Sequence, residues 1–186
     1  MRTQPLEGAI QTTRSVLMGV SRDQLGQSTP CASWKVSDLI NHIVGGQHFF
    51  AAGAMGQPPA GDGTDFSAGD FVSAFDEASA ACLAAFRTDG VMEAILKLPF
   101  GEMPGASFVG LAATDTFTHG WDLAKATGQP TDLAPDLAAG LLVGAMQFIS
   151  PTFRGEDGVA PFTAERPAPA GASNADQLAA FLGRTV

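Results

Sequence analysis

Apolar residues recur every three or four positions through two long stretches of this chain, and that spacing restricts the fold more than any other feature. Leu39, Ile43, Gly46 and Phe50 follow one another at intervals of four, three and four residues. The second stretch continues the same spacing with Phe71, Phe75, Ala78, Cys82 and Phe86. A period of about 3.6 residues places such side chains on one face of a helix. No segment alternates apolar and polar residues for long enough to build a sheet, so the sequence predicts a mainly α-helical bundle.

Start and stop signals give the expected order of the elements. We expect a helix that begins near Pro5, helices over 34–55, 71–86 and 107–127, one from Pro135, and a short one over 178–182. Gly128 and Pro130 end the fourth of these helices. Residues 90–107 contain two prolines and three glycines, which exclude a helix and favour an irregular or short β connection. The expected core includes Leu39, Ile43, Phe75, Cys82, Leu111 and Leu141.

Length, charge and cysteine content restrict the class of protein. The 186 residues predict one domain, residues 1–186. A formal net charge of −9 disfavours binding to nucleic acid or to an anionic membrane. No apolar run approaches the ~20 residues that span a membrane, and the N-terminus lacks the apolar region of a signal peptide. Cys31 and Cys82 are interpreted as reduced thiols, so we expect a cytoplasmic protein.

Polar residues interrupt the apolar face of the fourth predicted helix. Phe108, Leu111 and Ala112 begin this face, and the positions that continue it are occupied by acidic residues and a histidine. The three polar residues are Asp115, His119 and Asp122. Burial of an unpaired carboxylate at such a position costs several kcal/mol. We therefore expect a partner that satisfies these groups.

A metal ion is the partner that the spacing favours. Asp115 and His119 stand four residues apart, so both side chains lean toward one face of the helix. A third ligand has to come from another helix, and His42 lies at the edge of the apolar face of the second helix. His48 lies about 120° away around that helix and is expected to point outward. The sequence thus predicts a metal site made of His42, Asp115 and His119.

Simpler interpretations stay open for several of these residues. Asp115 and His119 could form a buried hydrogen-bonded pair without metal. Asp38 and Asp122 could orient the two ligand imidazoles, or could serve as a helix cap and a surface charge. Neither cysteine is placed by helical register beside the ligands. Cys31 precedes a helix start, and that position would suit a reactive thiol.

Several other site types are absent from the sequence. The chain has no Glu-x-x-His pair of the kind that a di-iron bundle requires, and no G-x-S-x-G, G-x-G-x-x-G or phosphate-binding Gly-Lys-Ser/Thr loop. Gly45 and Gly46 lie within the second helix, where they would permit close packing or access to a site.

Two long motifs resemble a known family. Residues 29–46 read TPCASWKVSDLINHIVGG, and residues 114–128 read TDTFTHGWDLAKATG. Both are similar to segments of actinobacterial metal-binding proteins that resemble the N-terminal domain of mycothiol-dependent maleylpyruvate isomerase, in the DinB/YfiT-like superfamily. This resemblance implies a DinB-like four-helix bundle with one or two additional C-terminal helices. It also carries the family's ligand positions onto His42, Asp115 and His119.

This chain differs from the family pattern in two respects. Many members of the superfamily use three histidines, whereas the middle ligand here is Asp115 and that of the isomerase is glutamate. The isomerase also has a second, C-terminal domain for which this chain is too short, so isomerisation of maleylpyruvate is not implied.

We therefore expect a divalent metal, zinc first, with nickel or iron as alternatives. Three protein ligands leave one coordination position for a low-molecular-weight thiol of the mycothiol type, which would react with a small electrophile without a protein nucleophile. A non-catalytic metal-binding bundle, a metal-dependent hydrolase and a mononuclear iron enzyme are the alternatives, and a homodimer is compatible with all of them.

Overall fold

The computed structural model describes residues 2–31, 33–58, 63–156, 159–160 and 162–186. Its helices are α1 Gln4–Met18, α2 Val36–Ala54, α3 Phe71–Phe86, α4 Gly105–Ala126, α5 Pro135–Phe148 and α6 Asn174–Phe181. Single 3-10 turns cover Arg22–Gln24, Phe66–Ala68 and Pro151–Phe153. The protein is mainly helical, as the apolar spacing predicts. None of the described helices is both long and apolar enough to cross a membrane.

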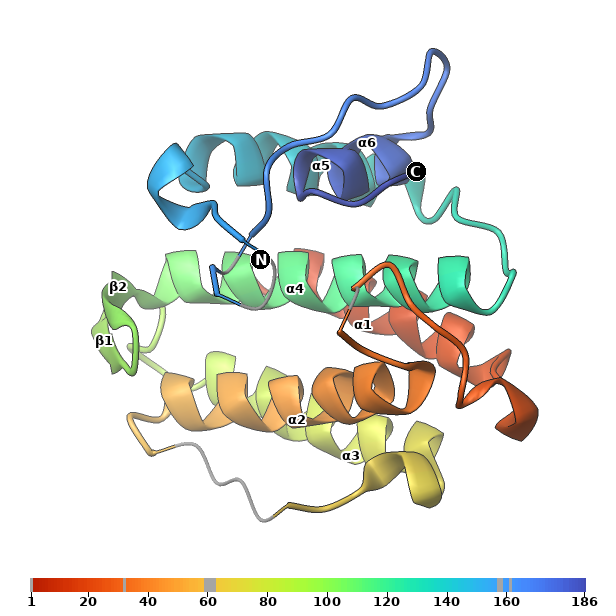
Figure 1. Cartoon of the computed structure of the whole chain (residues 1–186). Coiled ribbons are helices and arrows are strands. Elements are labelled where there is room, and N and C mark those ends of the chain that lie inside the picture. The colour runs from red at the N-terminus through yellow and green to blue at the C-terminus, as the bar shows by residue number, and fades with distance from the viewer. Residues whose placement is uncertain (1, 32, 59–62, 157–158, 161) are drawn as a thin grey trace.

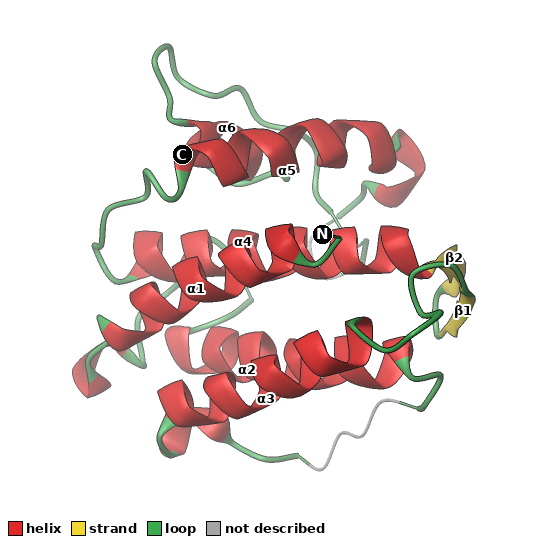
Figure 2. Ribbon diagram, turned by 180° about the vertical axis from the view of Figure 1, so that it is seen from behind, coloured by secondary structure: helices red, strands yellow, loops and turns green. Residues whose placement is uncertain are grey.

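Four helices form the bundle. α1 packs on α4 and α3, and α2 packs on α3 and α4, so that the four helices close a ring. α4 occupies the middle of Figure 1, and α1, which lies behind it there, comes to the front in Figure 2. α5 and α6 pack on each other and on α4 as an additional layer outside the bundle. This arrangement confirms the DinB-like bundle with extra C-terminal helices.

A two-stranded hairpin connects α3 to α4. β1 Ile95–Leu98 pairs antiparallel with β2 Gly101–Pro104, in a register that joins Ile95 to Pro104. The predicted short β connection is therefore confirmed, although α4 begins at Gly105 rather than at 107. A β-carbon at Gly105 would lie 1.9 Å from the carbonyl oxygen of Val91, so only glycine lets the helix start against the preceding loop.

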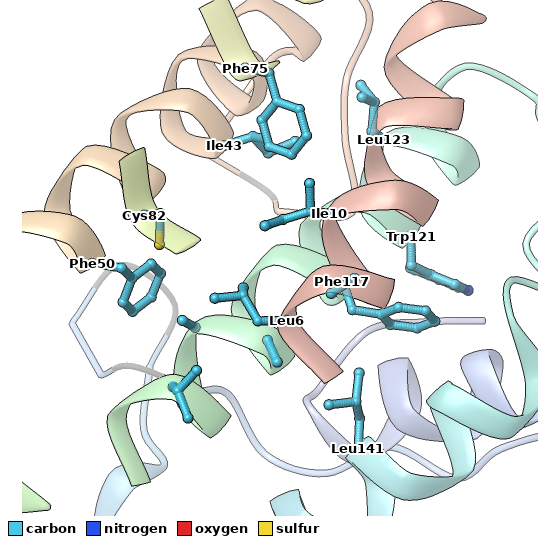
Figure 3. Packing of buried hydrophobic residues seen from close by; sticks show 14 of the residues in the cluster. Leu6, Ile10, Ile43, Phe50, Phe75, Cys82, Phe117, Trp121, Leu123 and Leu141 are labelled. Carbon is cyan, nitrogen blue, oxygen red and sulfur yellow. The ribbon is translucent and has the colours of Figure 1, made fainter. Parts of the chain in front are cut away.

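The core extends through the bundle and the C-terminal layer (Figure 3). Leu39, Ile43, Phe75, Cys82 and Leu141 are buried in it, as predicted. Burial raises the pKa of the Cys82 thiol to about 12, which makes it an inert apolar side chain. The prediction for Leu111 was wrong: Leu111 is half-buried and lines a cavity, because α4 turns that face toward the space beneath the C-terminal layer.

The last helix is longer than predicted. It begins at Asn174 rather than at 178, because the Ser173 hydroxyl accepts a hydrogen bond of 3.1 Å from the backbone N–H of Asp176. The Trp121 indole N–H donates to an Asp176 oxygen over 2.9 Å, which attaches this helix to α4.

Candidate metal centre

Three side chains from two helices meet in the middle of the α2–α4 contact. The Asp115 Oδ1 atom lies 3.9 Å from His42 Nε2 and 3.5 Å from His119 Nε2. The two imidazole rings are 4.5 Å apart between centroids and stand edge to face. One donor atom from each residue falls within 4.8 Å of the other two. The structure therefore brings together the residues that the sequence singled out.

The helix pairing explains this convergence. α2 and α4 run antiparallel, since the ring of Trp34 is 5.7 Å from that of His119 while Phe50 is 5.3 Å from Phe108. Gly46 faces Asp115 across the contact, and a β-carbon there would lie 3.7 Å from Asp115 Oδ2. The carboxylate of Asp115 therefore packs directly against α2 at Gly46.

The strongest indication that this site binds an ion or molecule comes from one ring nitrogen of His42. Its Nε2 atom is buried and has no hydrogen-bond partner, although 36% of the side chain is exposed. A buried imidazole nitrogen without a partner is costly unless something binds it. Two imidazole nitrogens and one carboxylate oxygen are a donor set that suits zinc, nickel or iron. The residues present thus fit a divalent metal ion.

Asp122 holds the other side of the His119 ring. Its Oδ2 atom lies 3.0 Å from His119 Nδ1, and its two oxygens accept from Arg184 Nε at 3.2 Å and Arg184 Nη2 at 2.9 Å. The Asp122 side chain is completely buried. A carboxylate in this position fixes the ring, with Nε2 on the side of Asp115. Asp122 is therefore not a surface charge, and its contact with His119 Nδ1 is compatible with an orienting role.

Electrostatics couple the buried charges. Burial opposes ionisation of Asp115, but the adjacent His119 and, to a lesser extent, the nearby His42 outweigh it and hold the Asp115 pKa well below its usual range. Burial likewise opposes protonation of His119, but Asp115 and Asp122 raise its pKa well above the ordinary value. Burial also disfavours the charge on Asp122, and Arg184 overcomes it, which lowers the Asp122 pKa to about 2.

The other candidates on α2 have different roles. The Asp38 Oδ2 atom accepts from the Lys35 backbone N–H at 2.9 Å, so Asp38 caps the start of the helix. His48 is exposed, as predicted, and stacks on Phe66 with 5.9 Å between ring centroids. Trp34 forms a wall of the site with its ring 4.5 Å from that of His42, whereas Trp121 belongs to the core.

A cavity of about 1410 Å³ opens onto the three side chains. Residues of α2, of α4 and of the C-terminal layer line it. One side of His42, Asp115 and His119 is therefore accessible to a small molecule, as a catalytic rather than a structural metal site requires.

Comparisons with known proteins identify the family of the chain. The sequence profile of the mycothiol maleylpyruvate isomerase N-terminal domain matches residues 6–124, which include all of α2 and α3, most of α1 and α4, and all three candidate ligands. The chain belongs to this family. An uncharacterised protein of Mycobacterium tuberculosis strain CDC 1551 / Oshkosh is 46% identical over 175 residues, with 92% of this chain and 91% of the relative covered. A protein of strain ATCC 25618 / H37Rv matches with the same values. No solved structure matches the chain significantly.

Within this family fold, Cys31 occupies a place that helical register did not predict. Its Sγ atom lies 3.4 Å from Asp122 Oδ2 and 3.6 Å from Arg184 Nη2, so the expectation that no cysteine lies beside the ligands was wrong. Cys31 precedes α2 in a turn in which Trp34 N donates to the Cys31 carbonyl at 2.8 Å. Helical register cannot place a residue that lies in a turn. In the sequence, the motif around Cys31 was the signal that could have pointed to this position.

Among the described residues, Cys31, His119 and Asp122 form a second set of possible metal donors. This set is electrostatically less suitable, because the Arg184 guanidinium already neutralises Asp122 and would repel a cation. The set around His42 contains no positive side chain other than its own imidazoles. Arg184 itself, 62 residues after Asp122, was not identified from the sequence as part of the site.

Proposed function

We propose that the protein binds one divalent metal ion through His42, Asp115 and His119, and that it transfers a low-molecular-weight thiol to an electrophile. The observation that carries this proposal is the buried, unpartnered Nε2 of His42 beside Asp115 and His119, at the wall of a large open cavity. Zinc is the metal we favour, with nickel and iron as alternatives. When bound, the metal would lower the pKa of a coordinated thiol and supply a thiolate near neutral pH.

The chain's own residues would orient and shield the reactants. Asp122 and Arg184 hold the ring of His119, and the indole of Trp34 covers the two imidazoles. The cavity end near the end of α4 is polar and is lined by Ser33, Lys125, Arg166 and Thr185. Such groups suit a hydroxylated thiol, in keeping with a family named for mycothiol. Thiol chemistry of this kind requires a reducing compartment, so we place the protein in the cytoplasm.

The extent of the functional unit is also a proposal. The matched family region ends within α4, while α5 and α6 pack on α4 and line the cavity through the segments next to them. We therefore treat residues 1–186 as one domain, in which the C-terminal layer completes the cavity.

Matched histidine variants on α2 test the proposal. Wild type, His42→Gln and His48→Gln are purified, analysed for bound metal, and assayed for the conjugation of mycothiol to benzyl bromide. We expect wild type and His48→Gln to bind one metal ion per chain and to accelerate the reaction. His42→Gln should lose both properties while its circular dichroism is unchanged. Metal-loaded wild type without any thiol-dependent rate would favour the non-catalytic bundle instead.

The second donor set is tested separately. Cys31→Ser removes a soft ligand from that set and leaves His42, Asp115 and His119 in place. If our assignment is correct, Cys31→Ser keeps its full metal content. A loss of metal in Cys31→Ser, with retention in His42→Gln, would assign the ion to Cys31, His119 and Asp122.

A further inference from the structure

The cavity has two chemically different ends, and the candidate metal ligands lie between them. Because α2 and α4 run antiparallel, Trp34 lies near the end of α4 and Phe49 lies near its beginning, with ring centroids of Phe49 and Phe108 6.2 Å apart. The polar lining residues Lys125, Arg166 and Arg184 belong to the first end. The other end, next to the hairpin, is lined mostly by apolar side chains.

We define this second end as the apolar chamber, lined by Phe49, Phe100, Met103, Leu111, Phe148 and Phe153. These residues come from α2, the hairpin, α4, α5 and the turn after α5. Phe49 and Phe100 are 6.2 Å apart between ring centroids, and Phe148 and Phe153 stack at 5.9 Å. The two ring pairs thus form walls contributed by distant parts of the chain.

The chamber walls are unusually exposed for residues of this type. Phe100 is 57% exposed, and Phe148 and Phe153 are about 40% exposed. Large apolar side chains that gather at an open cavity mark a ligand-binding surface more often than a packing defect. Glu102 is the charged residue among the described residues that line this end, and its charge is negative. Arg154 follows Phe153 but does not line the cavity, because its guanidinium lies over the Phe181 ring and donates to the Thr163 carbonyl. An anionic ligand would therefore lack a cationic partner among the lining residues of this end.

Gly45 keeps the chamber continuous with the metal ligands. His42, Gly45 and Phe49 follow one another along α2 at intervals of three and four residues, so they share one face of the helix. All three line the cavity. A β-carbon at Gly45 would meet no atom within 4 Å, so the space beside it is open. A ligand in the chamber can thus extend along Gly45 as far as His42.

We propose that the apolar chamber binds the electrophile, and that this electrophile is an uncharged molecule with an aromatic ring or an alkyl chain of similar size. The identity of the ligand as an electrophile rests on the proposed function. In the transfer, a sulfur electron pair of the thiol forms the new S–C bond. The leaving group departs with the electrons of the bond that it breaks, and the thiol proton passes to solvent. Apolar burial drives binding, and a carboxylate held among the chamber side chains would lose hydration without a cationic partner in the chamber.

Binding is tested with an unreactive pair of probes that differ in one charge. Acetophenone and para-acetylbenzoate are titrated by calorimetry into wild type, Gly45→Leu and Gly110→Leu. Gly110 lies on an exposed face of α4 outside the cavity and has the same open space for a side chain. We expect wild type and Gly110→Leu to bind acetophenone at least about tenfold more tightly than para-acetylbenzoate. Gly45→Leu should lose most of its acetophenone affinity.

A second variant makes the test independent of packing at Gly45. Phe100 is exposed at the hairpin, so Phe100→Lys places a cation at the chamber with little risk to folding. This variant should shift the preference toward para-acetylbenzoate by about tenfold or more. Equal binding of both probes to wild type, or equal behaviour of Gly45→Leu and Gly110→Leu, would overturn the proposal.

The outcome is separable from the proposed function. Acetophenone binding is measured in both metal-free and metal-loaded protein and requires no reaction. If acetophenone binds as expected but benzyl bromide is not conjugated, the chamber stands and the transferase proposal fails. If benzyl bromide and para-(bromomethyl)benzoate are conjugated equally well while acetophenone does not bind, the transferase proposal stands and the chamber fails.

Discussion

Asp122 connects the candidate metal ligands to the C-terminal end of the chain. One of its oxygens contacts His119, Arg184 and Cys31, and the other accepts a second hydrogen bond from Arg184. The side chains of His119 and Arg184 have little contact with solvent, and the carboxylate between them is fully buried. The position of His119 therefore depends on a carboxylate outside the proposed ligand set.

We predict that Asp122→Asn weakens metal binding by about 10- to 100-fold, the usual cost of losing a carboxylate behind a ligand histidine. The matched control is Asp38→Asn on α2. Asp38 caps the helix and lies one turn before His42, and asparagine keeps an oxygen that can accept the capping hydrogen bond, so this variant should cost less than about 1 kcal/mol of stability and leave metal affinity unchanged. Affinities are measured by competition with a chelator. Equal metal affinity in wild type and Asp122→Asn would contradict the orienting role.

Protonation of His119 competes with metal binding. In the metal-free protein its raised pKa favours the imidazolium paired with Asp115, and a metal has to displace that proton. We predict that metal affinity rises about tenfold per pH unit near neutrality and levels off above the His119 pKa. In the absence of metal, the stability supplied by this raised pKa is complete below about pH 6.5 and is lost as the pH rises through the folded value. Affinity that does not change between pH 6 and 8 would show that the imidazole is already neutral.

At the scale of elements, the contact between α1 and α4 is closer than side chains normally allow. A β-carbon at Gly120 would lie 2.3 Å from Thr13 Oγ1 and 3.2 Å from the Thr13 Cα. Thr13 also donates a hydrogen bond of 2.8 Å to the Thr116 carbonyl. Gly120 follows His119 directly, so the glycine that admits α1 also fixes the turn of α4 that carries a ligand.

We predict that Gly120→Ala destabilises the protein by roughly 1–3 kcal/mol, although alanine is the better helix former, because the helices have to move apart. Gly110→Ala, on the exposed face of the same helix, should instead stabilise it by about 0.5–1 kcal/mol. Urea denaturation of both variants measures the two changes. A gain of stability in Gly120→Ala would mean that α1 and α4 are not in the close contact described.

The elements show where sequence reasoning succeeds and where it stops. Regular spacing identified the long helices, and polar residues on the apolar face of α4 identified Asp115 and His119. Leu111 was misassigned because periodicity shows which face is apolar but not whether that face meets core or cavity. Cys31 and Arg184 approach Asp122 from a turn and from the segment after α6, and such contacts depend on tertiary packing that no local pattern encodes.

At the scale of the molecule, the bundle does not depend on the candidate metal for its core. The apolar cluster runs through α1 to α4 and into the C-terminal layer, while the three ligands lie at the cavity wall. A zinc ion that only stabilises a fold prefers four protein ligands, often cysteines, and its removal unfolds small domains. The open side of His42, Asp115 and His119 is the arrangement of an exchangeable site.

We therefore predict that chelation removes the metal without unfolding the protein. The helical circular dichroism should persist, and thermal unfolding should occur at a lower temperature because binding to the folded state no longer contributes. At a free metal concentration 100 times the dissociation constant, that contribution is about 2.7 kcal/mol. His48→Gln should show the same metal-dependent shift as wild type, and His42→Gln should show none, since its ligand set is incomplete. If chelation instead abolishes the helical signal of wild type, the ion is needed to hold the bundle together, and the non-catalytic interpretation becomes the better account of the site.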